Sequence, residues 1–149
     1  MKNHFFVFII SSLFSITAFA DPVAKPVQWT KYAQSGAFED YYDSSSVKPD
    51  GKNNLNVSAM RNLLDRASCS NLGYTDPITG MLDFCHRSMV WAMKIDCKNR
   101  TYMRGTRTMY QNGMATGRSI VDSASDTEWK PITSQFPEDV ELASRVCKK

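Results

Sequence analysis

The side chains that could support catalysis are few and poorly spaced for it. Of the two histidines, His4 and His86, only His86 lies outside the N-terminal leader described below. A Ser-His-Asp arrangement would depend on His86. Strand alternation places His86 on the other face of the strand from Trp91, which predicts a surface or second-face histidine. Three acids, Asp83, Asp96 and Asp122, have neither the pairing of a glycosidase nor the spacing of a calcium loop. We therefore expect no enzyme activity and no cofactor.

Metal binding is also not expected. The sequence has no Cys-x-x-Cys motif, and one histidine outside the leader is too few for the usual zinc sites. The eight methionines are explained by adaptable core packing, without a copper site.

Residues 1–20 are typical of a secretory signal peptide, with Lys2, an apolar run over residues 5–16 and a closing Ala18-Phe19-Ala20. The apolar run is too short for a membrane span, which needs roughly 20 residues. We expect cleavage after Ala20, and Asp21 follows where lipid attachment would need a cysteine. Residues 21–149 are then predicted to be a single exported domain without a transmembrane segment, located in the periplasm, on the cell surface or outside the cell.

The composition agrees with one globular domain. The 149 residues are 42% hydrophobic and 22% charged, which excludes a disordered tail and a polytopic membrane protein. The net charge of +3 is too small to indicate a nucleic-acid partner.

Alternating apolar and polar residues predict antiparallel strands. Over Cys85–Cys97 the odd positions are almost all apolar, so we expect one long strand with both cysteines on its buried face. Further strands are predicted over residues 27–34, 38–43, 55–63, 101–110 and 118–122, about six in all.

The C-terminal segment has a helical period instead. Phe136, Val140, Ala143 and Cys147 recur at spacings of four, three and four, which predicts a terminal helix that presents Cys147 to the core. Pro137 suits its first turn. The expected fold class is therefore α+β, an antiparallel sheet with a helix packed on one face.

The four cysteines, Cys69, Cys85, Cys97 and Cys147, predict two disulfides in an exported protein. Pairing Cys97 with Cys147 would tether the helix to the sheet and leave Cys69 with Cys85, and this scheme is preferred. Pairing Cys69 with Cys97 and Cys85 with Cys147 stays open, because Cys85 and Cys97 are expected to share a face.

Charge is unevenly distributed along the chain. Residues 94–118 carry six basic side chains and one acid, whereas residues 121–143 carry six acids and one base. Tyrosine and arginine interleave on the strand over residues 101–110, a combination suited to an acidic protein surface or a polyanion. The candidate partner-binding residues are Lys94, Lys98, Arg100, Tyr102, Arg104 and Arg107. The alternative is a solvated hairpin whose charges protect a strand edge from aggregation.

Several landmarks resemble the surface-adhesin protein E family of bacterial envelope proteins. They are Tyr41-Tyr42-Asp43, Ile95-Asp96-Cys97, Arg100-Thr101-Tyr102, Tyr110, Trp129-Lys130-Pro131-Ile132 and Val146-Cys147. The resemblance runs from Trp29 to Cys147. It implies a curved sheet with the helix held to its concave face by Cys97–Cys147, an adhesin-like role in binding host extracellular-matrix or plasma proteins, and homodimerisation as an option.

The leading hypothesis is thus an exported, non-catalytic binding module that uses its basic hairpin on a protein partner. The alternative is a soluble periplasmic inhibitor or envelope-maintenance factor of the same fold that never meets a host.

Overall fold

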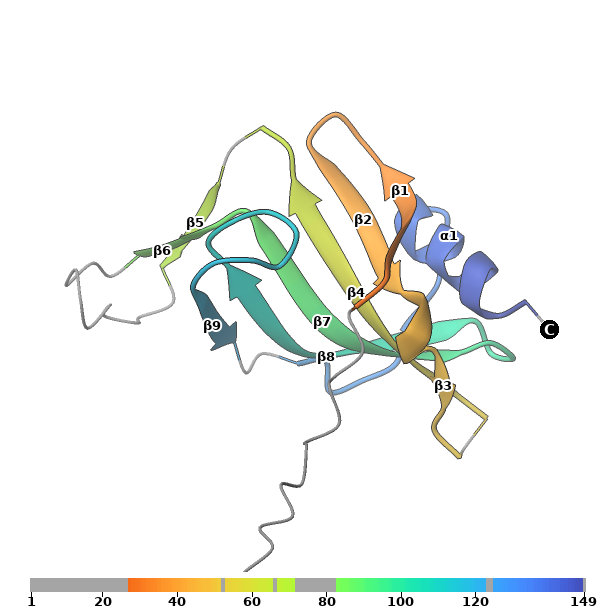
Figure 1. Cartoon of the computed structure of the whole chain (residues 1–149). Coiled ribbons are helices and arrows are strands. Elements are labelled where there is room, and N and C mark those ends of the chain that lie inside the picture. The colour runs from red at the N-terminus through yellow and green to blue at the C-terminus, as the bar shows by residue number, and fades with distance from the viewer. Residues whose placement is uncertain (1–26, 52, 66, 72–82, 123–124, 149) are drawn as a thin grey trace, which may run out of the picture.

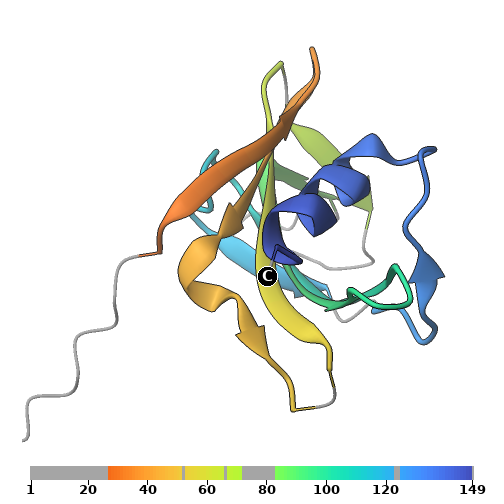
Figure 2. The ribbon, with the colours of Figure 1, turned by 90° about the vertical axis from the view of Figure 1, so that its right-hand side faces the viewer.

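The computed structural model describes residues 27–51, 53–65, 67–71, 83–122 and 125–148. It is a curved antiparallel sheet with one helix lying within its curve (Figures 1 and 2). The strand order is β1-β2-β4-β7-β8-β10, with β3 beside β4 and β9 beside β8, while β5 and β6 form a separate two-stranded sheet. The strands are β1 (Trp29–Gln34), β2 (Phe38–Asp43), β3 (Lys48–Pro49), β4 (Leu55–Leu63), β5 (Ser68–Asn71), β6 (Asp83–His86), β7 (Ser88–Asp96), β8 (Thr101–Tyr110), β9 (Ser119–Asp122) and β10 (Lys130–Pro131). The helices are α1 (Pro137–Val146) and the 3-10 turn η1 (Ser44–Ser46).

The predicted α+β architecture is confirmed, with an antiparallel sheet, a C-terminal helix and a disulfide that tethers it. The strand count differs because β3 and β10 have two residues each, too short to show an alternating pattern. The remaining additions, β5 and β6, pair only with each other.

The core lies between α1 and the inner face of the sheet, the face that carries Trp91, Met93 and Ile95. These three side chains are buried together with Leu142 and Val146 of the helix. The buried stripe of α1 is rotated from the predicted one, because Phe136 is exposed and Asp139 is buried instead. An ion pair to Asp139, described below, accounts for a carboxylate on the buried stripe.

The prediction of one unbroken strand over Cys85–Cys97 is wrong. The chain changes sheets at Arg87, between β6 and β7. The burial phase changes just after this break, since the buried positions are 84, 86 and 88 up to the start of β7 and 91, 93 and 95 within it. Phe84 and His86 are buried while Cys85 is exposed, so Cys85 and Cys97 do not continue one buried face. His86 is not a surface residue as one reading of the alternation allowed, because its side chain is 2% exposed.

A β-bulge in β8 decides which arginines face the core. Trp91 lies opposite Arg107 and Met93 lies opposite Arg104, so one residue of β7 faces two of β8. Residues directly opposite each other in adjacent strands share a face, and both arginines therefore lie on the inner face despite their odd spacing. Gly105 sits in the bulge, where a Cβ atom would lie 3.3 Å from the carbonyl oxygen of Ala92.

Candidate functional site

The six candidate binding residues divide into two groups. Lys94, Lys98 and Arg100 are exposed at the end of the β7–β8 hairpin. Tyr102, predicted to stand on a binding face, is instead 5% exposed and belongs to the core. The two remaining residues, Arg104 and Arg107, are partly buried on the inner face and make internal ion pairs. The fully exposed candidates are therefore the three around the hairpin turn.

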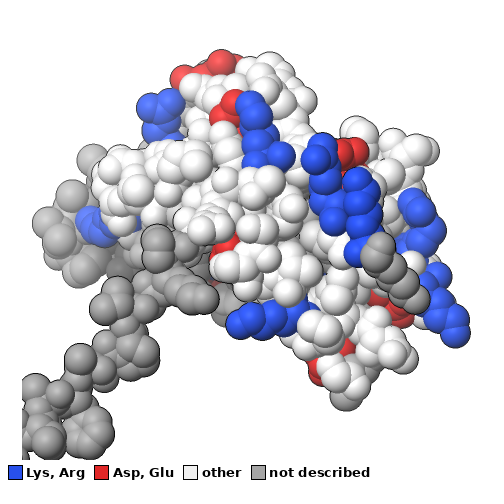
Figure 3. All heavy atoms as spheres, turned by 45° about the vertical axis from the view of Figure 1, so that its right-hand side comes forward, with Lys and Arg blue, Asp and Glu red and all other residues white. Residues whose placement is uncertain are grey.

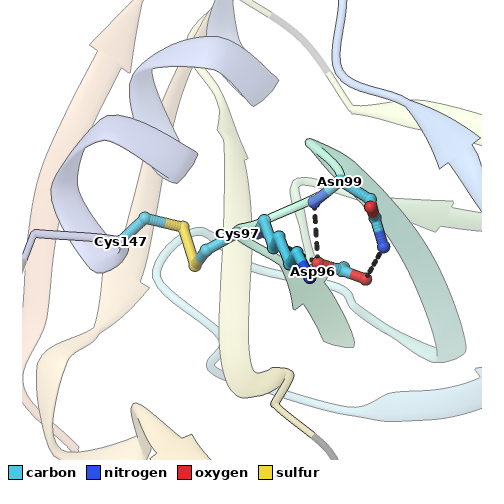
Figure 4. The surroundings of a disulfide bond; sticks show 5 residues. Asp96, Cys97, Asn99 and Cys147 are labelled. Atoms are coloured by element: carbon cyan, nitrogen blue, oxygen red, sulfur yellow. Dashed lines mark hydrogen bonds between the residues drawn. A yellow bond between two sulfur atoms is a disulfide. The ribbon is translucent and has the colours of Figure 1, made fainter.

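The turn after β7 is held by Asp96. Its carboxylate accepts hydrogen bonds from the backbone N–H of Lys98 at 3.0 Å and of Asn99 at 2.9 Å, and from the Asn99 side-chain amide at 2.7 Å (Figure 4). The backbone N–H of Asn99, followed by its side-chain amide, holds the pKa of Asp96 below its usual value. These contacts fix the backbone on which Lys98 and Arg100 stand.

A disulfide connects this turn to the helix. Cys97 is bonded to Cys147, just after α1, with an S–S distance of 2.03 Å and a Cα–Cα distance of 5.7 Å (Figure 4). The preferred pairing of these two cysteines is confirmed, and the competing scheme is excluded. The carbonyl oxygen of Arg100 also accepts a hydrogen bond from the backbone N–H of Ile132 at 2.9 Å. The turn is thus attached to both the helix and the segment after β10.

Two further cations lie near the three exposed candidates. Lys48 is aligned with Lys94 across β4, because both are partners of Asn56 in the sheet register. Two strand spacings separate them by about 10 Å. Lys148 lines a hollow of about 200 Å³ together with Arg100 and the disulfide. We call Lys48, Lys94, Lys98, Arg100 and Lys148 the basic end. Lys48 could not be assigned to this group from the sequence, because only the pairing of the strands brings it near Lys94.

The partly buried arginines are paired with acids. Arg104 Nη2 donates to both oxygens of Asp139 on α1, at 2.9 and 3.1 Å, and Arg107 pairs with Asp122 on β9. The basic and acidic stretches of the sequence therefore neutralise each other in part within the fold. In Figure 3 the basic groups of the visible face stand apart, some beside acidic groups, without forming one continuous field.

Sequence reading missed a third internal arginine. Arg61 Nε and Nη2 donate to the two carboxylate oxygens of Asp40 at 2.8 and 2.7 Å, and Nη2 also donates to Glu138 of α1 at 3.1 Å. Asp40 is fully buried, and this burial raises its pKa although Arg61 acts in the opposite direction. The pair joins β2, β4 and α1 beneath the helix.

The second predicted disulfide is not settled by the described residues. The backbone register sets Cys69 directly opposite Cys85 in the β5–β6 pair, and Cys85 is disulfide-bonded. The side chain of Cys69 lies outside the described residues, so the pairing of these two cysteines stays a prediction.

Metal ligands and membrane-spanning helices were the remaining site features, and the described ranges contain neither. No three His, Cys, Asp or Glu side chains in them are grouped to hold a metal ion. In the same ranges, no helix has the length and apolar character to cross a membrane.

Comparisons with known proteins agree with this architecture. The family model described as surface-adhesin protein E matches residues 29–148. A structure of Haemophilus influenzae protein E superposes with a TM-score of 0.61 and 17% identity, covering 86% of this chain and 89% of that one. Protein E from non-typeable Haemophilus influenzae gives a TM-score of 0.57 and 15% identity over 84% and 81% of the two chains. No curated protein matches in sequence.

Proposed function

Because the chain belongs to the surface-adhesin protein E family, we propose that it is an exported, non-catalytic binding module whose basic end docks on an acidic patch of a protein partner. The family points to a surface protein without enzymatic activity. The partners we propose are host extracellular-matrix or plasma proteins.

The observation that carries this proposal is the rigid attachment of exposed cations. Lys98 and Arg100 stand on a turn that is fixed by Asp96, by the Cys97–Cys147 disulfide and by the hydrogen bond to Ile132. A surface that is already ordered loses less conformational entropy when it binds. The basic end therefore meets one of the main requirements of a docking surface.

The internal ion pairs favour an acidic protein patch over a long polyanion. Arg104 and Arg107 are paired with Asp139 and Asp122, so they add little positive field outside the fold. The remaining cations are spread over a small area, which matches a local acidic patch better than a long polyanion. Charges at the rim of an interface mainly set the association rate and its salt dependence. Heparin serves as the polyanion comparator in the test below.

The binding test uses the oxidised mature protein against immobilised matrix and plasma proteins at low and physiological salt. The variant Lys94→Ala/Lys98→Ala/Arg100→Ala should reduce binding at least tenfold at low salt. The matched control is Lys31→Ala, an exposed lysine on the distant edge strand β1, which should leave binding unchanged. Equal binding by the triple variant would remove the basic end from the proposal, and tighter binding to heparin than to any protein would overturn the choice of partner.

Location separates this function from the periplasmic alternative. We propose that the leader is removed after Ala20, which mass spectrometry of the exported protein would detect as an N-terminus at Asp21. An adhesin must be cleaved by protease added to intact cells, whereas a soluble periplasmic inhibitor or envelope factor is protected. Homodimerisation remains a proposal, and sedimentation of the mature protein over a range of concentrations tests it.

A further inference from the structure

A second hollow lies on the inner face of the sheet and is not part of the basic end. Its volume is about 400 Å³, and its lining includes Arg61, Arg104, Arg107, Trp91 and Met89. This volume falls in the range of small-molecule sites, roughly 300–1,000 Å³.

Strand register explains why three arginines surround one apolar floor. Arg61 of β4 is the partner of Met89 on β7, and Arg107 of β8 is the partner of Trp91. The bulge at Gly105 turns Arg104 to the same face. The centre of the floor is thus an indole and a thioether from β7, with guanidinium groups from the strands on both sides.

Three hydrogen-bond donors on residues that line the hollow have no acceptor within the described part of the chain. Among the described residues, the Nε–H groups of Arg104 and Arg107 and the indole N–H of Trp91 are buried with no partner. Buried donors of this kind are normally satisfied, and all three belong to residues that line the hollow. The arginine side chains are also accessible from outside, with 38% of Arg104 and 37% of Arg107 exposed. The three donor atoms themselves are closed off from solvent, so an acceptor reaches them only after these side chains shift. The accessible parts of the two arginines favour a ligand that brings acceptor oxygens.

The charges around the hollow restrict the ligand further. Asp40 and Glu138 pair with Arg61, Asp139 pairs with Arg104, and Asp122 pairs with Arg107. The lining acid Asp126 is paired with Lys130. These pairs set four cations against five acids. The site therefore offers directed donors without a net positive charge, which disfavours a phosphate dianion or a polyanion more strongly than a single carboxylate. Because Nη2 of each arginine already donates to an acid, a bound carboxylate would accept a charge-assisted hydrogen bond from the Nε–H of each arginine in turn.

We propose that this hollow binds one carboxylate carried on an aromatic or apolar body. The carboxylate lies between Arg104 and Arg107, and the body packs on Trp91 and Met89. A carboxylate on such a body could come from two sources, a free small aromatic acid or the C-terminal residue of a peptide. This inference does not depend on the proposed docking of the basic end, because the two sites share no residue.

The test is a titration of the mature oxidised protein followed by ¹H–¹⁵N NMR of indole and arginine Nε–H groups. The chain has three tryptophans, and the Trp91→Phe variant assigns the signal of Trp91. The probes are 1-naphthylacetate for the free acid and N-acetylphenylalanine for the peptide terminus, each compared with its uncharged amide and with inorganic phosphate.

With a carboxylate probe we expect saturable shifts of three N–H signals, those of the Trp91 indole and of Arg104 and Arg107 Nε. The affinity obtained from these shifts should be at least tenfold lower for the amide of the probe and for phosphate. The probe with the higher affinity identifies the source. Arg104→Lys keeps the charge but loses Nε, and should weaken binding at least fivefold, whereas the basic-end control Lys94→Ala should not change it. Shifts that are absent, equal for acid and amide, or confined to other tryptophans would overturn the proposal, and this wild-type result stands even if Arg104→Lys fails to fold.

Discussion

Replacement of Arg61 by methionine probes the buried charges that hold the helix to the sheet. Asp40 is fully buried, and both of its carboxylate oxygens accept hydrogen bonds from Arg61. Methionine retains much of the apolar volume of the arginine stem but supplies no donor, so the carboxylate is left buried without its partner. Removing one member of a buried ion pair costs about 3–5 kcal/mol, and we expect a loss of this size at neutral pH.

The loss should depend on pH in a defined direction. Burial already raises the pKa of Asp40, and the Arg61 hydrogen bonds and charge oppose that rise. Without Arg61 the pKa of Asp40 rises further, so the folded variant takes up a proton more readily than the unfolded chain. A raised folded-state pKa adds stability as pH falls. The difference between wild type and variant should therefore narrow as pH falls from neutral through the raised pKa of Asp40 in the variant.

Urea unfolding of the oxidised protein, followed by circular dichroism at several pH values, measures this effect. The matched control is Lys31→Met, because Lys31 pairs with Glu39 at 3.0 Å on the surface and is 45% exposed. Surface pairs of this kind contribute about 0–1 kcal/mol. Adding Asp40→Asn to Arg61→Met should restore part of the stability. A loss of stability no larger than that of the control, or one that grows as pH falls, would show that Asp40 does not depend on Arg61 for its buried charge.

Three other predictions concern the turn and the bulge. Changing Cys97 and Cys147 together to serine should lower the free energy of unfolding by about 4 kcal/mol on the chain-entropy model, measured in urea; an unchanged unfolding midpoint would contradict it. The pKa of Asp96 is lowered by its contacts to the turn, so its contribution is present above about pH 4 and lost as pH falls through the lowered pKa. As pH falls through this pKa, hydrogen exchange at the backbone N–H of Asn99, corrected for intrinsic rates, should accelerate. Constant protection of this N–H down to pH 2 would be evidence against the role of Asp96 in holding the turn. Gly105→Val places a side chain against β7 and should cost about 1–3 kcal/mol, whereas wild-type stability would show that the bulge does not need glycine.

The sequence could predict those parts of the fold that depend on local periodicity. Alternation in β7 correctly placed Trp91, Met93 and Ile95 in the core, because residues of one strand keep their phase while the strand stays regular. The same rule failed at Arg87, where the chain moves into another sheet, and at Gly105, where one extra residue changes the phase. Neither irregularity alters composition or spacing in a way that a linear pattern reveals.

The candidate site was predictable only in part, for a related reason. The exposed cations at the hairpin end follow from turn chemistry, and their exposure was expected. The partners of Arg61 lie 21 and 77 residues away in sequence, and that of Arg104 lies 35 residues away. An arginine on a strand looks like an interruption of the apolar face until the fold brings its carboxylate into place. The hollow between these arginines is therefore a property of the tertiary structure.

The most direct test of the central claim, that the disulfide-anchored basic end is the docking surface, is a measurement of association and dissociation rates for a partner found in the binding screen. We expect Lys94→Ala/Lys98→Ala/Arg100→Ala to slow association at least tenfold at low salt, with a much smaller effect on dissociation and a weaker salt dependence of the association rate. Association as fast as that of the Lys31→Ala control, with the same salt dependence, would contradict it.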